Sequence, residues 1–293
     1  MTWLQSIVIA VIEGVTEFLP ISSTAHIKFT KAIMGMDPHE AFSNMFDIVI
    51  QFAAVMAVIV LYWKKFLDFK GIAFYVKLII AVIPALVFGL LLKKHINNLL
   101  GNVTVIACIT VLGGVVLLFV DSWFKKPEVH DEERITNAQA LKVGLCQILS
   151  IIFPGLSRSA STIIGGMAAK LDKKVAAEFS FFLAVPTMAA ATAKDILDTY
   201  KKNPEVFHNT DNLGMLVVGC LVSFIVSVLA IKSFITYVQK HSFRAFGVYR
   251  IIAGLAILAL IYTGVIKKEP KETVVPKPAA CAQHVTESYL VNQ

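Results

Sequence analysis

Six long apolar runs constrain this chain more than any other feature of its sequence. Each run is close to the ~20 residues that an α-helix needs to cross the hydrocarbon core of a bilayer. The runs cover residues 46–63, 72–92, 103–120, 176–193, 213–234 and 246–266. The composition agrees, because 57% of the residues are hydrophobic and only 16% are charged, whereas soluble domains carry about 25% charged residues. The sequence therefore predicts an all-α, polytopic membrane protein with six transmembrane helices.

The net charge of +7 would suggest a nucleic-acid partner in a soluble protein. Here the basic residues cluster in short segments between the apolar runs, as charges that flank membrane helices do. These clusters are Lys64, Lys65 and Lys70; Lys125 and Lys126; Lys170, Lys173 and Lys174; and Lys240 and Arg244. We expect a membrane environment and no nucleic acid. The positive-inside tendency puts these clusters in the cytoplasm and both termini outside, against opposing lysines such as Lys201 and Lys202.

A polar stretch at residues 121–137 divides the predicted membrane domain, residues 1–266, into halves with the same layout. Residues 1–120 and 138–266 each begin with a short interrupted segment, which three apolar runs follow. Neither short segment can cross a bilayer, and each ends at a proline, so we expect two re-entrant helical hairpins.

Three spans separate the hairpins, which turns the second half upside down and predicts an inverted repeat. Aligning Pro20 with Pro154 places Ser23 opposite Ser157. The remaining residues, 267–293, are predicted to be a disordered tail.

Each interrupted segment carries a polar patch, and the first contains two acidic residues. Glu13 and Glu17 are four positions apart, so both carboxylates lie on one face of a helix. They form either a solvated helix face or a pair that holds a divalent cation through oxygen ligands. Ionisable residues at membrane depth are costly and usually functional, which favours the cation.

Both patches are also typical of anion sites. Ser22, Ser23 and Thr24 follow the first break, and Ser157, Arg158 and Ser159 follow the second. Hydroxyls at a helix start, with the unpaired N–H groups and partial positive charge found there, suit phosphate oxygens. An arginine adds bidentate geometry for phosphate, although it could instead pair with a carboxylate. Some of the hydroxyls are expected to be ordinary caps.

The remaining polar residues of the apolar segments are open to two interpretations. His26 lies one turn beyond the first break and is either a satisfied core residue or a general acid/base that shares the cavity. Asp47 and Gln51 are expected to line that cavity, while Arg250 either anchors a neighbouring helix or reaches the site. Because two carboxylates repel a phosphate group, we predict that Mg²⁺ or Ca²⁺ bridges them.

The motif from Glu13 to His26 (EGVTEFLPISSTAH) and the motif from Pro154 to Ser159 (PGLSRS) resemble those of the bacterial undecaprenyl-diphosphate phosphatase family, the bacitracin-resistance type. The resemblance covers about residues 1–266. It implies removal of the terminal phosphate from undecaprenyl diphosphate, which regenerates the lipid carrier of cell-wall synthesis. It also implies a location in the bacterial inner membrane, and we expect the active site to face outside.

The resemblance also implies residue roles. The paired glutamates of the family correspond to Glu13 and Glu17, its histidine to His26, its serine–arginine pair to Ser157 and Arg158, and its proposed serine nucleophile to Ser23. Ala25 and Ala160 stand where glycine is usual, and each adds only a methyl group. A metal-bound water remains an alternative nucleophile, a flippase of the lipid monophosphate remains an alternative function, and a homodimer remains possible.

Overall fold

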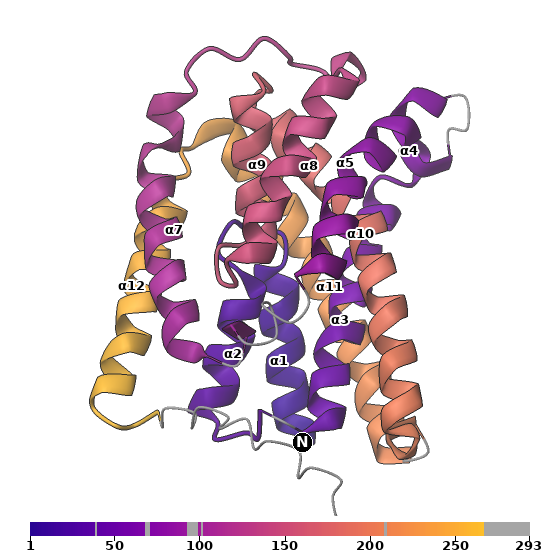
Figure 1. Cartoon of the computed structure of the whole chain (residues 1–293), viewed down its shortest axis with the longest axis vertical. Helices are drawn as coiled ribbons and strands as arrows, with labels where there is room; N and C mark the ends of the chain where they lie inside the picture. Colours follow the sequence, from indigo (N-terminus) through magenta and orange to yellow (C-terminus); the bar gives the residue numbers. More distant parts are fainter. Residues whose placement is uncertain (39, 68–70, 93–98, 101, 208–209, 267–293) are drawn as a thin grey trace, which may run out of the picture.

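The computed structural model describes residues 1–266 except 39, 68–70, 93–98, 101 and 208–209. The predicted tail, 267–293, therefore lies outside the described residues. Among the residues described, six helices are long and apolar enough to cross a membrane, which confirms the predicted number of spans. They are α3 (Ala41–Leu61), α5 (Ile72–Leu91), α7 (Val103–Trp123), α10 (Lys173–Lys202), α11 (Thr210–Lys240) and α12 (Arg244–Tyr262). The fold is all-helical, with the helices bundled roughly along one axis (Figure 1).

Four shorter helices form two hairpins. The first hairpin consists of α1 (Trp3–Thr16) and α2 (Ser23–Ile33), and the second consists of α8 (Asn137–Ile152) and α9 (Arg158–Ala168). The first lies in the lower half of Figure 1 and the second in the upper half. The structure confirms a helix, a break and a second helix in each half. Their re-entrant course through a bilayer and the inverted repeat stay predictions.

Local sequence signals explain both hairpins. Thr2 with Gln5 and Thr136 with Gln139 form capping boxes, so α1 and α8 begin in the same way. Both helices end before a proline, whose ring is incompatible with a continuing helix. The second helix of each hairpin begins after a serine N-cap with positive φ.

The caps correct the alignment of the two halves. Thr2 precedes the cap Ser22 by 20 positions, whereas Thr136 precedes the cap Ser157 by 21. The extra residue lies between the proline and the cap, because Ser22 follows Pro20 by two positions and Ser157 follows Pro154 by three, and Ser157 therefore corresponds to Ser22. Ser23 corresponds to Arg158 and not to Ser157, because aligning the prolines ignores the extra residue.

The two halves are interleaved. Helix α1 packs on α11 of the other half, and α8 packs on α5 of the other half, while α7 packs on α12. Aromatic side chains of α10 fill the centre, where Phe181 meets Phe18 edge to face at 5.1 Å between ring centroids. The first helix of each hairpin is therefore held by a span from the half to which it does not belong, whereas α9 packs on α10 and α2 on α7 of their own halves.

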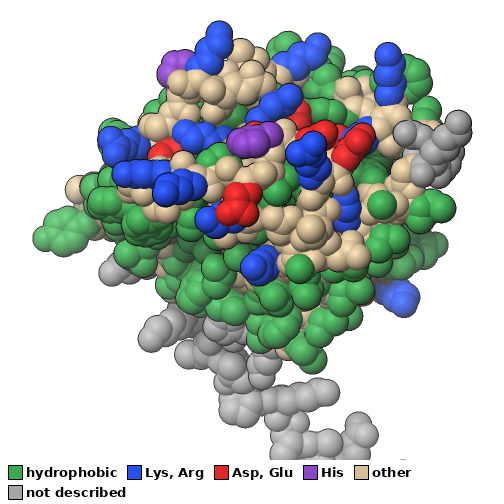
Figure 2. All heavy atoms as spheres, turned by 90° about the horizontal axis from the view of Figure 1, so that it is seen from above, with side chains coloured by type: hydrophobic (Ala, Val, Ile, Leu, Met, Phe, Trp, Pro, Cys, Tyr) green, Lys and Arg blue, Asp and Glu red, His purple; other side chains and the backbone are tan. Residues whose placement is uncertain are grey.

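The end of the molecule drawn at the top of Figure 1 carries many lysines and arginines, which Figure 2 shows from above. Two short helices lie near this end, α4 (Trp63–Leu67) and the 3₁₀ turn Glu132–Arg134. Ion pairs join the segments here: Lys65 contacts Glu132, and Lys173 contacts Asp121 at 2.5 Å. A further 3₁₀ turn, Pro204–Phe207, follows α10 at the other end.

Candidate active site

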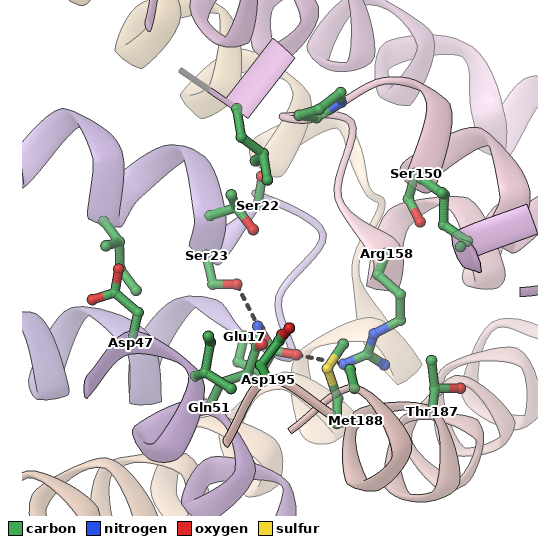
Figure 3. A pocket seen from close by; sticks show the side chains of 18 of the residues that line it. Glu17, Ser22, Ser23, Asp47, Gln51, Ser150, Arg158, Thr187, Met188 and Asp195 are labelled. Carbon is green, nitrogen blue, oxygen red and sulfur yellow. Dashed lines mark hydrogen bonds and ion pairs between the residues drawn. The ribbon is translucent and has the colours of Figure 1, made fainter. Parts of the chain in front are cut away.

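A cavity of about 1050 Å³ lies where the two breaks meet α3, α5 and α10. Residues of the first break, the second break and these spans contribute to its wall (Figure 3). Of the predicted site residues, seven line it: Glu13, Glu17, Ser22, Ser23, Thr24, Ser157 and Arg158. Asp47 and Gln51 from α3 line it as well, as expected. The structure thus brings the acidic and the basic patch to one place.

A row of three side chains crosses this cavity (Figure 3). The Ser23 hydroxyl donates a hydrogen bond to Glu17 Oε2 at 2.5 Å. Arg158 Nη2 donates to the other oxygen, Glu17 Oε1, at 2.6 Å. Glu17 and Ser23 are only 5% and 6% exposed, so the contacts form away from bulk water. Chemically, such a row can act as a nucleophile (the hydroxyl), a general base (the carboxylate) and a cation that orients the base (the guanidinium).

Neighbouring groups hold this row in position. Gln51 Nε2 donates to Glu17 Oε2 at 3.3 Å, and Arg158 Nη1 donates to the Ser180 carbonyl oxygen at 3.1 Å. The Nε of Arg158 is buried and has no hydrogen-bond partner among the described residues. The two contacts use two of the five N–H groups of the guanidinium, so further donors remain for another acceptor, such as a phosphate oxygen.

Glu13 differs from Glu17 in its surroundings. Its side chain is fully buried, and neither carboxylate oxygen accepts a hydrogen bond from an N–H or O–H donor within the part of the chain that the structure describes. An unpaired buried charge is strongly unfavourable, and the negative charge of Glu17 adds to it. A hard divalent cation would satisfy both oxygens. Among the described residues no group of three or more acidic, histidine or cysteine side chains that could hold a metal occurs, so Glu13 and Glu17 would hold it without a third such ligand.

The serine caps shape the anion side of the cavity. Ser22 Oγ accepts a hydrogen bond from the Ala25 amide at 3.3 Å, and Ser157 Oγ accepts one from the Ala160 amide at 3.2 Å. Both serines are thus ordinary N-caps, as expected for some of the hydroxyls. The first amides of α2 and α9 then point out of the helix starts, next to Ser23 and Arg158.

Ser159 lies outside this cavity. Its hydroxyl is 1% exposed and donates to the Phe18 carbonyl oxygen at 2.7 Å. The side chain points back from α9 to the first break, so it joins the two hairpins instead of facing the cavity. This corrects its predicted place in the diphosphate-binding set.

His26 also does not line the cavity, contrary to the expectation that it shares the space of the serines. Its Nδ1 lies 2.7 Å from the Ser22 carbonyl oxygen, and its Nε2 lies 2.9 Å from the Tyr249 hydroxyl. The imidazole also stacks on the Tyr249 ring. Nδ1 has a partner at the start of its own helix, whereas Nε2 has one because Tyr249 of α12 lies beside it, which the sequence of the first motif cannot reveal. Its role in acid/base catalysis stays a prediction.

Comparison with known proteins identifies the family. The family model described as "Bacitracin resistance protein BacA" matches residues 6–256. The chain belongs to this family. A relative from Flavobacterium johnsoniae is 49% identical over 261 residues, which cover 89% of this chain and 96% of the relative. One from Bdellovibrio bacteriovorus is 44% identical over 90% of this chain and 98% of the relative. Both relatives are named undecaprenyl-diphosphatase.

The family and the six apolar helices make the chain a multi-pass membrane protein. The two alanines of the helix starts, Ala25 and Ala160, are accommodated within the fold. Ala25 and Ala160 are buried, and their amides make the cap hydrogen bonds described above.

Two polar pairs beside the site were not predicted. Lys31 is buried on α2 and donates to Asp47 Oδ2 at 2.6 Å and to the Ser43 carbonyl oxygen at 3.1 Å. Asp47 lines the cavity, as expected, but its charge is balanced by this lysine. Gln147 Nε2 lies 3.4 Å from the Thr187 hydroxyl on the opposite wall. A lysine within an apolar helix was the signal that could have found the first pair.

Proposed function

We propose that this protein is a membrane phosphatase that hydrolyses undecaprenyl diphosphate to undecaprenyl phosphate and inorganic phosphate. The names of its relatives support this substrate, and membership of the BacA family supports a role in recycling the lipid carrier and in bacitracin resistance. The observation that carries the proposal is the row of Ser23, Glu17 and Arg158 in a cavity between the spans. The diphosphate would lie against this row, with the prenyl chain between spans.

The row assigns a role to each side chain. Glu17 accepts the Ser23 proton as general base, so that Ser23 Oγ attacks the terminal phosphorus. The bond from that phosphorus to the bridging oxygen breaks, undecaprenyl phosphate leaves, and a phosphoserine remains. Water then hydrolyses the phosphoserine and releases inorganic phosphate. Arg158 orients Glu17 through Nη2 and offers its remaining N–H donors to the phosphate.

Attack by water in place of Ser23 gives the same products, and one experiment separates the two routes. The purified protein in detergent is incubated with undecaprenyl diphosphate, and the release of phosphate is measured for the wild type and for Ser23→Ala. The serine route predicts that the variant is inactive and that a phosphoserine can be trapped in the wild type. Activity retained in Ser23→Ala would assign the attack to water.

The same assay tests the rival function. A carrier of the lipid monophosphate moves its cargo between two compartments, which detergent removes. Release of inorganic phosphate by the wild type in detergent therefore requires hydrolysis, and no release would refute the proposed phosphatase.

The proposal includes a divalent cation, Mg²⁺ or Ca²⁺, held by Glu13 together with Glu17. When bound, the cation offsets the repulsion between these carboxylates and the phosphate oxygens. The unpartnered oxygens of Glu13 support it. Treatment with EDTA should abolish phosphate release, and Mg²⁺ or Ca²⁺ should restore it. Glu13→Gln should require a higher cation concentration for half-maximal activity, whereas an unchanged requirement would exclude Glu13 as a ligand.

We also place the protein in the bacterial inner membrane with the cavity open to the outside. The cavity wall includes Lys28, Pro38 and Lys202, from segments at the end of the molecule where the N-terminus lies (Figure 1). The opposite end bears the lysine and arginine clusters (Figure 2), which the positive-inside tendency assigns to the cytoplasm.

A further inference from the structure

Arg250 on α12 is fully buried and lies outside the wall of the active-site cavity. Its guanidinium donates hydrogen bonds to four main-chain carbonyl oxygens, those of Thr110 (3.2 Å), Pro20 (3.0 Å), Leu156 (2.8 Å) and Gly155 (2.8 Å). These acceptors come from α7, the first break and the second break. One side chain thus binds both interrupted segments and a span at the same time.

The acceptors lie next to the reacting groups along the chain. Pro20 is three residues before Ser23, and Leu156 is two residues before Arg158. The carbonyl oxygens of Pro20, Gly155 and Leu156 lie in the breaks beyond the helix ends and accept no backbone hydrogen bond among the described residues, and such oxygens are costly when buried. Arg250 satisfies them in both breaks with charge-assisted hydrogen bonds, which are stronger than neutral ones.

Helix α7 leaves room for this guanidinium. A Cβ atom at Gly113 would collide with Arg250 Nη2 and would lie 2.9 Å from its Cζ. A side chain at this position would therefore push the guanidinium away from the breaks. The neighbouring Leu112 is 64% exposed and offers a control position on the outer face of the same helix.

We propose that Arg250 is a positioning residue for the reaction: by binding the carbonyls of both breaks it aligns Ser23 and Glu17 with Arg158. This inference rests on the proposed phosphatase function. Arg250 contacts neither the Glu17 carboxylate nor the Ser23 hydroxyl, and it acts through the backbone. Losing it should misalign the row while leaving the cavity able to accept substrate.

Two substitutions test this. Arg250→Lys keeps the charge but cannot reach acceptors in three segments, and Arg250→Met removes every donor. Since a misplacement of about 1 Å can cost about a hundredfold in rate, we expect kcat to fall by about that factor in both variants, with KM changed much less. Hydrogen exchange should become faster at residues 17–26 and 153–161 and stay unchanged in α3 and α11. Arg244→Met, an exposed change on the same helix, is the control.

Gly113→Ala provides a second test in case Arg250→Met does not fold. It keeps the arginine but displaces its guanidinium, so kcat should fall and exchange at the two breaks should rise, whereas Leu112→Ala should behave as wild type. Wild-type kcat in folded Arg250→Lys or in Gly113→Ala would overturn the inference. Faster exchange along the whole chain would also overturn it, by assigning Arg250 a general structural role. Absence of phosphate release in the wild type would instead refute the proposed function.

Discussion

The Glu17 carboxylate is held by three side chains from three helices. It accepts hydrogen bonds from Ser23, Gln51 and Arg158, while Glu13, one helical turn earlier, has no such partner among the described residues. Two glutamates on one helix face are therefore chemically different. Glu17 is placed to accept a proton from the Ser23 hydroxyl, whereas the Glu13 carboxylate can bind a cation or a proton.

We predict that Glu17→Gln nearly abolishes phosphate release. The amide cannot accept the Ser23 proton, and general base catalysis contributes about 10²–10⁴-fold. It also leaves the buried Arg158 without its countercharge, and breaking a buried ion pair costs about 3–5 kcal/mol. Both effects can be measured in detergent, as phosphate release and as the midpoint of thermal unfolding.

Gln51→Ala is the matched comparison for that prediction. It removes one hydrogen bond to the same oxygen, worth about 1 kcal/mol, and retains the base and the ion pair. We expect a smaller loss of both activity and stability than for Glu17→Gln. Glu17→Gln with activity within tenfold of wild type would contradict the assignment of Glu17 as the base.

At the scale of elements, the second break depends on a glycine. Gly155 has φ +99°, and a Cβ atom there would lie 2.7 Å from the Ile106 carbonyl oxygen. That oxygen belongs to the backbone of α7, which cannot move aside as a flexible side chain would. The break can approach α7, and so reach Arg250, only because this residue has no side chain.

We predict that Gly155→Ala lowers both thermal stability and phosphate release, with Gly35→Ala as its control. Gly35 also has positive φ (+64°), but nothing lies within 4 Å of its Cβ position. Gly35→Ala should therefore cost only the backbone strain of a left-handed residue, about 1–2 kcal/mol. Gly155→Ala adds the collision and displaces the break. Equal unfolding midpoints and equal activities for the two variants would show that the contact with Ile106 is unimportant.

At the scale of the whole molecule, the sequence predicted what depends on local spacing. Apolar length located the six spans, the four-residue spacing placed Glu13 and Glu17 on one cavity wall, and the prolines marked both breaks. It also predicted that the two patches share one cavity. The first three follow from neighbours within a few turns of helix, and the shared cavity follows from the repeated layout of the two halves and the chemistry of their patches.

What the sequence could not predict depends on distant contacts. Arg158 and Glu17 are 141 positions apart, and Arg250 and Pro20 are 230 apart. The hydroxyl of Ser159 and the ring of His26 turn away from the cavity because Phe18 and Tyr249 lie beside them in the folded bundle. No periodicity encodes such neighbours, so both residues looked equivalent to those that do face the cavity.

The two ends of the bundle lead to the last prediction, which concerns orientation. Lys202 lines the cavity near the end that bears the N-terminus, and Lys125 is exposed in the segment that follows α7 at the basic end. In a variant whose native cysteines are replaced by serine, Lys202→Cys should react with a membrane-impermeant maleimide on intact cells. Lys125→Cys should react only after the membrane is permeabilised. The reverse pattern would place the cavity mouth in the cytoplasm, because the two positions lie at opposite ends of the spans and cannot be reached from the same side.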